Sequence, residues 1–101
     1  MKQRAVVLSP KDNVATVLAD LKAGESLEVE AGGKPTSFKM AQDIPFGHKF
    51  SLASIAADAP IIKYGEVIGT ATTPIAPGDY VHVHNIVSAR ARGDLKGGKA
   101  A

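Results

Sequence analysis

Cysteine is absent from the 101-residue chain. Without thiols the chain has no disulfide framework and no thiolate metal site, so a cytoplasmic location is the expectation. Long apolar stretches are missing as well. The run from Ala5 to Leu8 is too short for a signal peptide, and no run approaches the roughly 18 residues that a membrane-spanning helix needs. The sequence therefore predicts a soluble protein that is neither exported nor membrane-bound.

Aromatic residues make up only 5% of the chain. The formal net charge of +2 comes from the C-terminus: residues 1–88 contain eight Lys and Arg against nine Asp and Glu, whereas residues 89–101 contain four against one. Because no basic face interleaved with aromatic residues is present, nucleic acid is not an expected partner. The charge distribution and length predict a single domain over residues 1–88 and a flexible basic tail over residues 89–101.

A glycine-centred pattern occurs three times, at residues 21–29, 44–52 and 75–83. Each copy reads apolar-x-x-Gly-x-x-apolar-x-apolar. Glycine supplies the positive φ of a tight turn, and two apolar residues at alternate positions of the following strand face one core. The pattern predicts a compact, mostly β fold of short strands, with at most one or two short helices.

Other segments fit this interpretation less uniformly. Residues 12–21 have apolar residues at helical spacing and Asp12 as a candidate cap, which predicts a helix, although their β-branched residues leave a strand as the alternative. Residues 51–60 read as a strand that runs into a turn or short helix. Residues 4–8 and 37–41 read as strands.

The stretch YVHVHN, residues 80–85, places two histidines at alternate positions. In an extended strand, His82 and His84 share one face with Tyr80, and the two valines face the core. Two imidazoles on one face can bind one divalent metal if a third ligand comes from elsewhere. The alternative is a pair of exposed or hydrogen-bonded histidines.

Two further stretches carry polar groups beside a turn glycine. In FGHKF, His48 and Lys49 follow the glycine directly, and loops on a β scaffold commonly carry function. In IKYGEVIG, Lys63 is a candidate carboxylate anchor or base, Tyr64 a candidate proton donor, and Glu66 a candidate metal ligand or acid–base group. The alternatives are a solvated turn and an exposed polar hairpin.

Taken together, the motifs DNVA, IPFGHKFSL, IKYGEVIG, IAPGDYVHVHN and ARGD resemble one family in their order and spacing. Over residues 4–94 the chain is similar to the SAF-type domain of the altronate and galactarate dehydratases, specifically the small subunit of altronate-dehydratase-like enzymes. The same type of domain occurs in the small subunit of sulfolactate sulfo-lyase and, more distantly, in the antifreeze-like domains of sialic acid synthases.

The resemblance implies a β-clip fold, a large catalytic subunit as partner, a divalent metal (Fe²⁺ or Mn²⁺) and a sugar-acid substrate. In the family reaction an aldonate or aldarate loses water to give a 2-keto-3-deoxy acid. The isolated chain is expected to be inactive. The alternatives are a sulfo-lyase subunit, a non-catalytic module that binds sugar acids or regulates the large subunit, and a homo-oligomeric β domain without a ligand.

The resemblance also implies residue roles. The Gly-His-Lys turn and the Tyr-Gly segment are expected to supply the catalytic residues: His48, Lys49, Lys63, Tyr64 and Glu66. His82 and His84 are expected as metal ligands, with a contact with the large subunit as the alternative. A contact with the large subunit is expected of Asn85, Arg90 and Arg92.

Overall fold

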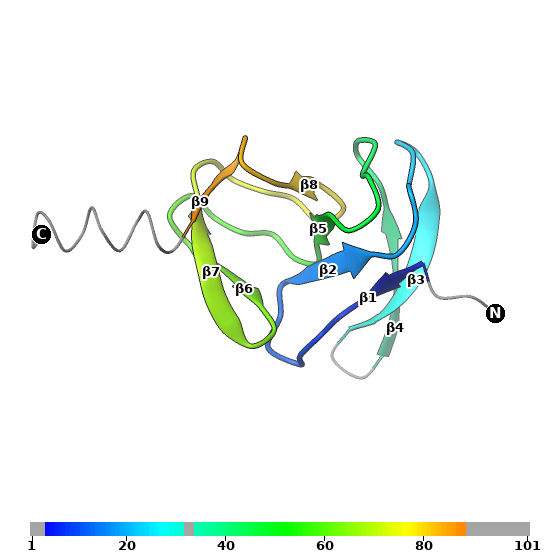
Figure 1. Cartoon of the computed structure of the whole chain (residues 1–101), viewed down its shortest axis with the longest axis horizontal. Coiled ribbons are helices and arrows are strands. Elements are labelled where there is room, and N and C mark those ends of the chain that lie inside the picture. Colours follow the sequence, from blue (N-terminus) through cyan, green and yellow to red (C-terminus); the bar gives the residue numbers. More distant parts are fainter. Residues whose placement is uncertain (1–3, 32–33, 89–101) are drawn as a thin grey trace, which may run out of the picture.

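The computed structural model describes residues 4–31 and 34–88. Within them the chain forms nine strands and no helix: β1 (Ala5–Val6), β2 (Val14–Val17), β3 (Ser26–Ala31), β4 (Lys34–Lys39), β5 (Lys49–Ser51), β6 (Pro60–Lys63), β7 (Glu66–Ala71), β8 (Tyr80–Val81) and β9 (Ile86–Ser88). The predicted mostly β fold is confirmed (Figure 1). No helix in these ranges is long and apolar enough to span a membrane. The predicted basic tail, with Arg90 and Arg92, lies outside the described residues.

Three antiparallel sheets share the described residues. A four-stranded sheet in the order β1-β2-β5-β8 lies between the β3–β4 hairpin and a three-stranded sheet in the order β6-β7-β9 (Figure 1). Two apolar clusters fill the spaces on either side, and β2 contributes to both: Val17 packs in the cluster with Phe38 and Phe50, and Val14 in the cluster with Ile61. The central sheet therefore joins two small cores into one domain.

The helix expected over residues 12–21 is wrong, and the strand alternative is confirmed for Val14–Val17, which is strand β2. This strand pairs with β1 along one edge and with β5 along the other. Val14, Ala15 and Val17 are all buried. A central strand buried on both faces loses the simple apolar–polar alternation, and its β-branched residues suit an extended chain.

The described residues contain four turns of the same geometry, one more than the glycine pattern predicted. In each copy the N–H of the fourth residue donates to the carbonyl oxygen of the first residue at 3.0 Å. The four turns are 22–25, 45–48, 56–59 and 76–79. The third residue of each turn has a positive φ: Gly24 (+90°), Gly47 (+87°), Asp58 (+72°) and Gly78 (+90°). This is the geometry of a type II turn. The 56–59 copy was concealed because Asp58 takes the place of glycine, and aspartate tolerates the left-handed region better than most residues.

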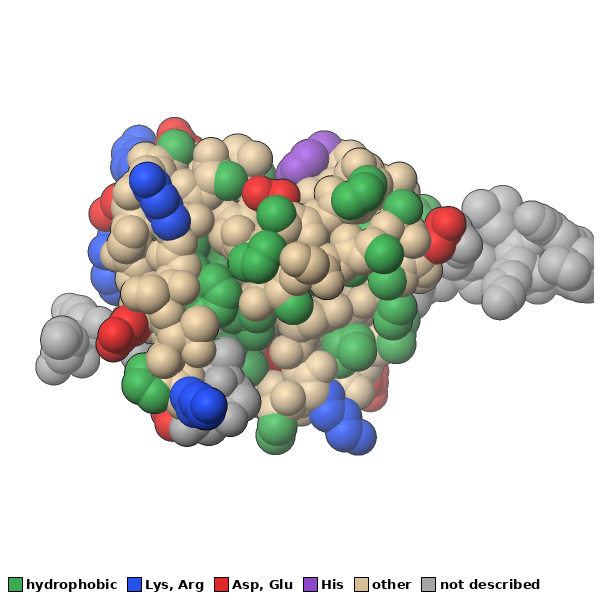
Figure 2. All heavy atoms as spheres, turned by 180° about the vertical axis from the view of Figure 1, so that it is seen from behind, with side chains coloured by type: hydrophobic (Ala, Val, Ile, Leu, Met, Phe, Trp, Pro, Cys, Tyr) green, Lys and Arg blue, Asp and Glu red, His purple; other side chains and the backbone are tan. Residues whose placement is uncertain are grey.

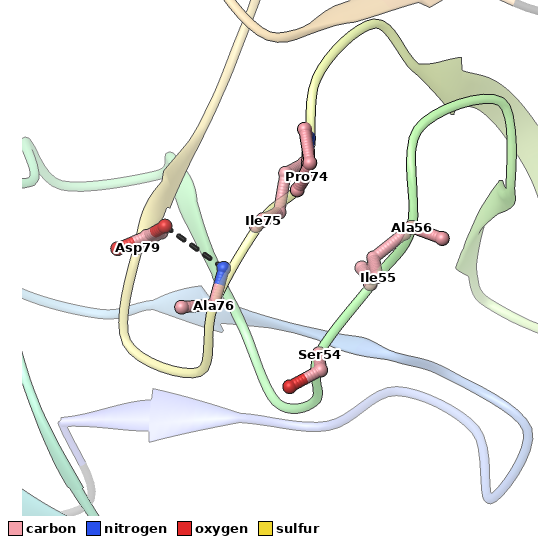
Figure 3. Close-up of a pocket in the computed structure, with 7 residues that line it drawn as sticks. All are labelled: Ser54, Ile55, Ala56, Pro74, Ile75, Ala76 and Asp79. Carbon is pink, nitrogen blue, oxygen red and sulfur yellow. Dashed lines mark hydrogen bonds between the residues drawn. The ribbon is translucent and has the colours of Figure 1, made fainter.

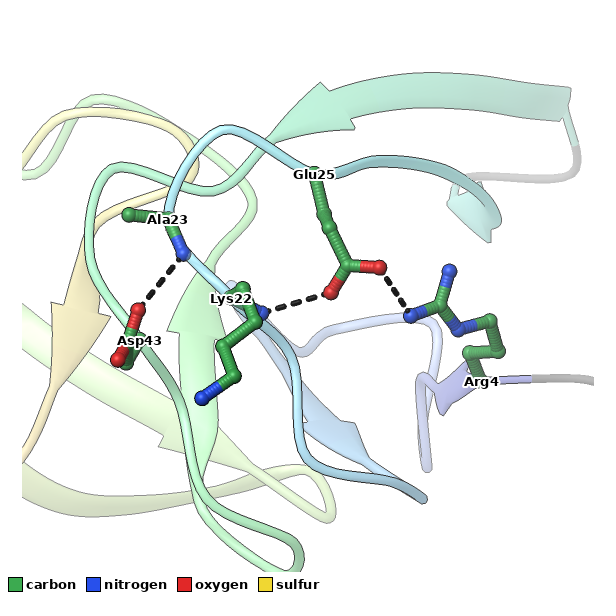
Figure 4. A network of polar contacts seen from close by, with 5 residues as sticks. All are labelled: Arg4, Lys22, Ala23, Glu25 and Asp43. Atoms are coloured by element: carbon green, nitrogen blue, oxygen red, sulfur yellow. Dashed lines mark hydrogen bonds and ion pairs between the residues drawn. The ribbon is translucent and has the colours of Figure 1, made fainter.

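The turns associate in pairs through isolated β-bridges, Leu21 with Ile44 and Ile55 with Ile75. In the first pair, the aspartate that precedes each bridge residue hydrogen-bonds to the other turn. A carboxylate oxygen of Asp43 accepts the N–H of Ala23 in the 22–25 turn at 2.9 Å (Figure 4). A carboxylate oxygen of Asp20 accepts the N–H of Phe46 in the 45–48 turn at 2.8 Å. These carboxylates fix the loop that leads to His48.

The second pair of turns borders a mostly apolar hollow in the surface (Figure 3). Its lining consists of Ser54, Ile55, Ala56, Pro74, Ile75, Ala76 and Asp79. None of the candidate site residues lines this hollow.

Candidate functional site

His48 is the last residue of the 45–48 turn, and its side chain does not hydrogen-bond to the first residue of that turn. At the equivalent position of two other turns, Glu25 and Asp79 each accept the first N–H of their own turn at 2.7 and 2.9 Å (Figure 4 shows Glu25). The first residue of the His48 turn is Pro45, which has no N–H to satisfy. The proline therefore allows residue 48 to be an imidazole that contacts another segment.

Tyr80, in β8, lies at the centre of an aromatic cluster that contains all three histidines of the chain. Its hydroxyl is 2.7 Å from Nδ1 of His48. Its ring stacks on that of His82 with an interplanar angle of 5° and is 5.4 Å from the ring of His84, centroid to centroid. The His48 and His82 centroids are 4.6 Å apart. Sequence reasoning grouped Tyr80 with His82 and His84 but did not place it among the site residues.

The strand expected over residues 80–85 ends at Val81, and residues 82–85 form a bend and a turn. Val83, expected in the core, is 78% exposed. The side chain of Asn85 explains the change: its amide oxygen accepts the N–H of His82 at 3.0 Å, and its amide nitrogen donates to the carbonyl of Tyr80 at 2.8 Å. Asn85 is 6% exposed, so it organises the turn from inside.

Lys49 and Lys63 add charge beside the histidines. Burial lowers the pKa of the half-buried Lys49, and the like charge of Lys63 lowers it further. Burial also lowers the pKa of His82, followed by the charges of His48, Lys49 and His84. Every charged group that shifts these two pKa values is basic. These basic residues, together with Tyr80, which contacts all three histidines, are called the cationic cluster: His48, Lys49, Lys63, Tyr80, His82 and His84.

Several histidine side-chain atoms lie at the surface (Figure 2). Hydrophobic side chains are exposed on the same face. Phe46, two residues before His48, is 64% exposed, and Val83 lies between His82 and His84. The cationic cluster therefore has accessible apolar neighbours in the chain.

The described side chains around the histidines lack the set of ligands that a divalent metal needs. Within residues 4–31 and 34–88, no three His, Cys, Asp or Glu side chains are grouped so that they could hold an ion. Nδ1 of His48 is engaged by Tyr80, and the ammonium of Lys49 repels a cation nearby. By themselves, His82 and His84 and their described neighbours do not fit Fe²⁺ or Mn²⁺.

Lys63 and Tyr64 are consecutive but lie in different environments. Lys63 ends β6, which is tied to the central sheet by Asn13: the side-chain oxygen of Asn13 accepts the N–H of Ile62 at 2.7 Å. Tyr64 and Gly65 are the central residues of the β6–β7 hairpin turn, with φ of +60° and +77°. In Figure 1 this turn lies at the end of the domain opposite the β8–β9 connection.

The structure therefore brings together some of the predicted site residues and separates others. His48, Lys49, His82 and His84 gather, and Lys63 is within electrostatic reach of Lys49. Tyr64, 72% exposed, and Glu66, also exposed, flank Gly65 at the hairpin turn. Their catalytic roles stay predictions.

We expect Tyr64→Asn to raise the free energy of unfolding by about 1 kcal/mol. Tyr64 occupies the first central position of a turn with positive φ at both central residues, where Asn-Gly is preferred and a bulky residue is strained. Urea denaturation of the two proteins measures the difference. A variant less stable than the parent would show that contacts of the tyrosine ring outweigh the backbone strain.

Stability is expected to decline between pH 7.5 and 5.5. The pKa of His82 in the folded chain lies below its ordinary value of 6.5, so near and below pH 6.5 the unfolded chain binds more protons and is favoured. The loss levels off below the folded pKa. Denaturation curves at several pH values measure the effect, and His82→Gln should reduce the slope. A parent stability that rises toward pH 5.5 would contradict the sign.

Comparison with known proteins identifies the domain. Residues 3–89 match the family model described as the altronate/galactarate dehydratase SAF domain. The chain is 46% identical over 74 residues to the altronate dehydratase of Escherichia coli (strain K12). The aligned residues make up 73% of this chain and 14% of that relative. It is 34% identical over 88 residues to the (2R)-sulfolactate sulfo-lyase subunit alpha of Chromohalobacter salexigens, which covers 84% of this chain and 94% of that relative.

A third relative is the galactarate dehydratase (L-threo-forming) of Escherichia coli (strain K12), 38% identical over 78 residues, or 75% of this chain and 14% of the relative. The chain thus spans about a seventh of the length of the altronate dehydratases that it matches, but nearly all of the sulfo-lyase subunit. The domain occurs within long dehydratases and as a separate subunit. By its sequence match and its mostly β fold, the chain belongs to the altronate/galactarate dehydratase SAF-domain family.

Proposed function

We propose that the chain is the small subunit of an altronate-dehydratase-like hydro-lyase, which removes water from a sugar acid to give a 2-keto-3-deoxy acid. The single observation that carries this proposal is the convergence of His48, Lys49 and His82, from two distant segments, on one cationic cluster. The cluster supplies polar groups to a site whose remaining wall belongs to a large subunit.

The chemistry of the reaction calls for these residue types. The C2 proton of a sugar acid lies next to a carboxylate and is only weakly acidic, so its removal requires a base and stabilisation of negative charge on the carboxylate oxygens. An acid then assists departure of the C3 hydroxyl. A neutral imidazole is suited to proton transfer near pH 7, and ammonium groups are suited to stabilising the charge.

We assign these roles within the cluster. We assign the ring proton of His48 to Nδ1, which donates to the Tyr80 hydroxyl oxygen at 2.7 Å, so that Nε2 holds the lone pair that accepts the substrate proton. Lys49 stands beside it with a pKa lowered by burial and by Lys63, which brings its ammonium closer to the range in which it can donate a proton. Lys63 supplies a second positive charge toward the carboxylate.

Metal dependence, on Fe²⁺ or Mn²⁺, is part of the proposal only through the family resemblance. Because the described residues do not fit a divalent ion by themselves, no step above passes through one. We propose that most ligands of such an ion come from the large subunit. Treatment of the assembled complex with a chelator, followed by addition of either ion, measures the dependence.

The test of the proposed function is reconstitution. The chain is co-purified with its natural large subunit, and a panel of aldonates and aldarates is assayed for 2-keto-3-deoxy acid formation with added ferrous or manganous ion. We expect activity from the complex and none from the isolated chain. Dehydration of altronate by the isolated chain, or failure of the complex on every sugar acid, would refute the proposal.

A second candidate function is that of a sulfo-lyase small subunit, in which sulfite leaves in place of water. The observation that favours it is the coverage of 94% of the sulfo-lyase subunit alpha by this chain. Assay of the same complex with sulfolactate, followed by sulfite release, separates the two. A homo-oligomer without a ligand would show neither activity, and its mass in solution would be a multiple of the mass of the chain.

A further inference from the structure

No carboxylate of the described residues forms an ion pair with a member of the cationic cluster, although Glu66 is the cross-strand partner of Lys63 and an acidic side chain lies beside the histidine atoms in Figure 2. The ion pair found in residues 4–31 and 34–88 joins Arg4 to Glu25 at 2.8 Å and includes no member of the cluster. Asp20, Asp43 and Asp79 accept backbone N–H groups of the turns. Like charges held together without a counter-ion disfavour the arrangement.

The geometry of the cluster presents hydrogen-bond donors at one place. His48 and His82 lie ring to ring at 4.6 Å between centroids, and Tyr80 contacts both of them and His84. Lys49 is adjacent to His48 and is paired across the sheet with Val81, the residue before His82. The imidazole rings are therefore grouped, and the charge of Lys49 reaches His82, so the cluster offers hydrogen-bonding ring nitrogens and positive charge.

The electrostatic effects point the same way. Charges on His48, Lys49 and His84 each lower the pKa of His82, and Lys63 lowers that of Lys49. A bound anion would reverse these repulsions and accept charge-assisted hydrogen bonds. A divalent cation would increase them and would find no group of three ligands among the described residues.

We infer that the cationic cluster is an oxyanion-binding site of the isolated chain, which takes the carboxylate or sulfonate of a small hydroxy acid and not a divalent cation. The identity of the ligand as a hydroxy acid rests on the proposed function, whereas the binding of an oxyanion rests on the cluster itself. The site is the part of the substrate pocket that this chain supplies before the large subunit is present.

The histidines make the inference directly measurable. The chain has three histidines, and all belong to the cluster, so every histidine ring signal in an NMR spectrum reports on this site. The full chain is titrated at constant pH and ionic strength with gluconate as carboxylate, isethionate as sulfonate, sorbitol as neutral control and Mn²⁺ as cation. We expect saturable shifts of the His48 and His82 ring signals with at least one oxyanion, and none with sorbitol.

Two variants and one control test the assignment. Lys49→Gln should raise the Kd for the oxyanion by at least about fivefold, because it removes a charge-assisted hydrogen bond. His84→Gln changes an exposed residue and should also weaken oxyanion binding. Lys39→Gln removes an exposed lysine of β4 outside the cluster and should leave the affinity unchanged. Backbone amide signals away from the cluster establish that each variant is folded.

The outcomes are separable. Tighter binding of gluconate identifies a carboxylate site, and tighter binding of isethionate identifies a sulfonate site. Shifts no larger than those with added NaCl, equal shifts with sorbitol, or line broadening by stoichiometric Mn²⁺ without any oxyanion effect would each overturn the inference. An active complex whose small chain binds no oxyanion alone would refute this inference only, whereas oxyanion binding with a complex inactive on every acid would refute the proposed function only.

Discussion

Gly78→Ala is expected to unfold the domain under conditions in which Gly24→Ala stays folded. Both glycines have a φ of +90° at the same position of their turns. A Cβ at Gly24 meets nothing within 4 Å, whereas a Cβ at Gly78 would lie 2.2 Å from the backbone oxygen of Lys39. The backbone cannot yield easily, because Gly78 donates its N–H to Ser51 and accepts that of Ala41.

The pair of variants separates backbone strain from steric overlap. Strain alone costs about 1–2 kcal/mol, which is the expected loss for Gly24→Ala. For Gly78→Ala we expect more than about 4 kcal/mol, a large share of the stability of a small domain. Urea denaturation followed by circular dichroism measures both. Equal losses would show that the contact between the 76–79 turn and β4 is not rigid.

His48→Ala in the reconstituted complex is expected to lower kcat by about 10² or more, the usual contribution of a positioned acid or base. Removal of the imidazole breaks no hydrogen bond within the turn, because Pro45 has no N–H that the side chain of residue 48 could accept. Steady-state kinetics on the preferred sugar acid, at several pH values, give kcat and KM separately. Lys39→Ala is the matched control on an exposed strand position and should change neither.

The pattern of the change distinguishes the two classes of function. If His48 transfers a proton, kcat falls and the complex still assembles with normal stoichiometry. Tyr80→Phe should then produce a smaller loss together with a changed pH profile, because the hydroxyl that engages Nδ1 of His48 is gone. A change confined to KM or to assembly would contradict the catalytic role and favour a non-catalytic sugar-acid-binding module.

Local chemistry in the sequence was enough to predict most of the turns that build this fold. Three of the four were predicted from glycine with apolar residues at fixed offsets, since few other residues adopt positive φ. The fourth was concealed by Asp58, which has a φ of +72° in the same place. The β2 segment was interpreted wrongly because its spacing is ambiguous alone, and pairing on both edges decides its conformation.

The candidate site divides along the same line. Its residue types, and the grouping of His82 and His84 near Tyr80, were evident from the stretch YVHVHN. Their geometry was not, because a buried Asn85 turns the chain after Val81 and exposes Val83. Asparagine is a residue type whose side chain bonds nearby backbone groups and competes with a strand, so Asn85 was a local signal that the strand interpretation of residues 80–85 overlooked.

By itself, then, the sequence determined the family, the mostly β class and the inventory of imidazole and ammonium groups, since these follow from motifs and turn chemistry within a few residues. Tertiary structure alone decided that His48 meets Tyr80, that Lys63 acts on Lys49, and that Tyr64 lies in a turn at the other end of the domain. Those facts depend on pairing between strands that are distant in the sequence, such as Lys49 with Val81, 32 residues apart, and such pairing is set by how two small cores close around one sheet.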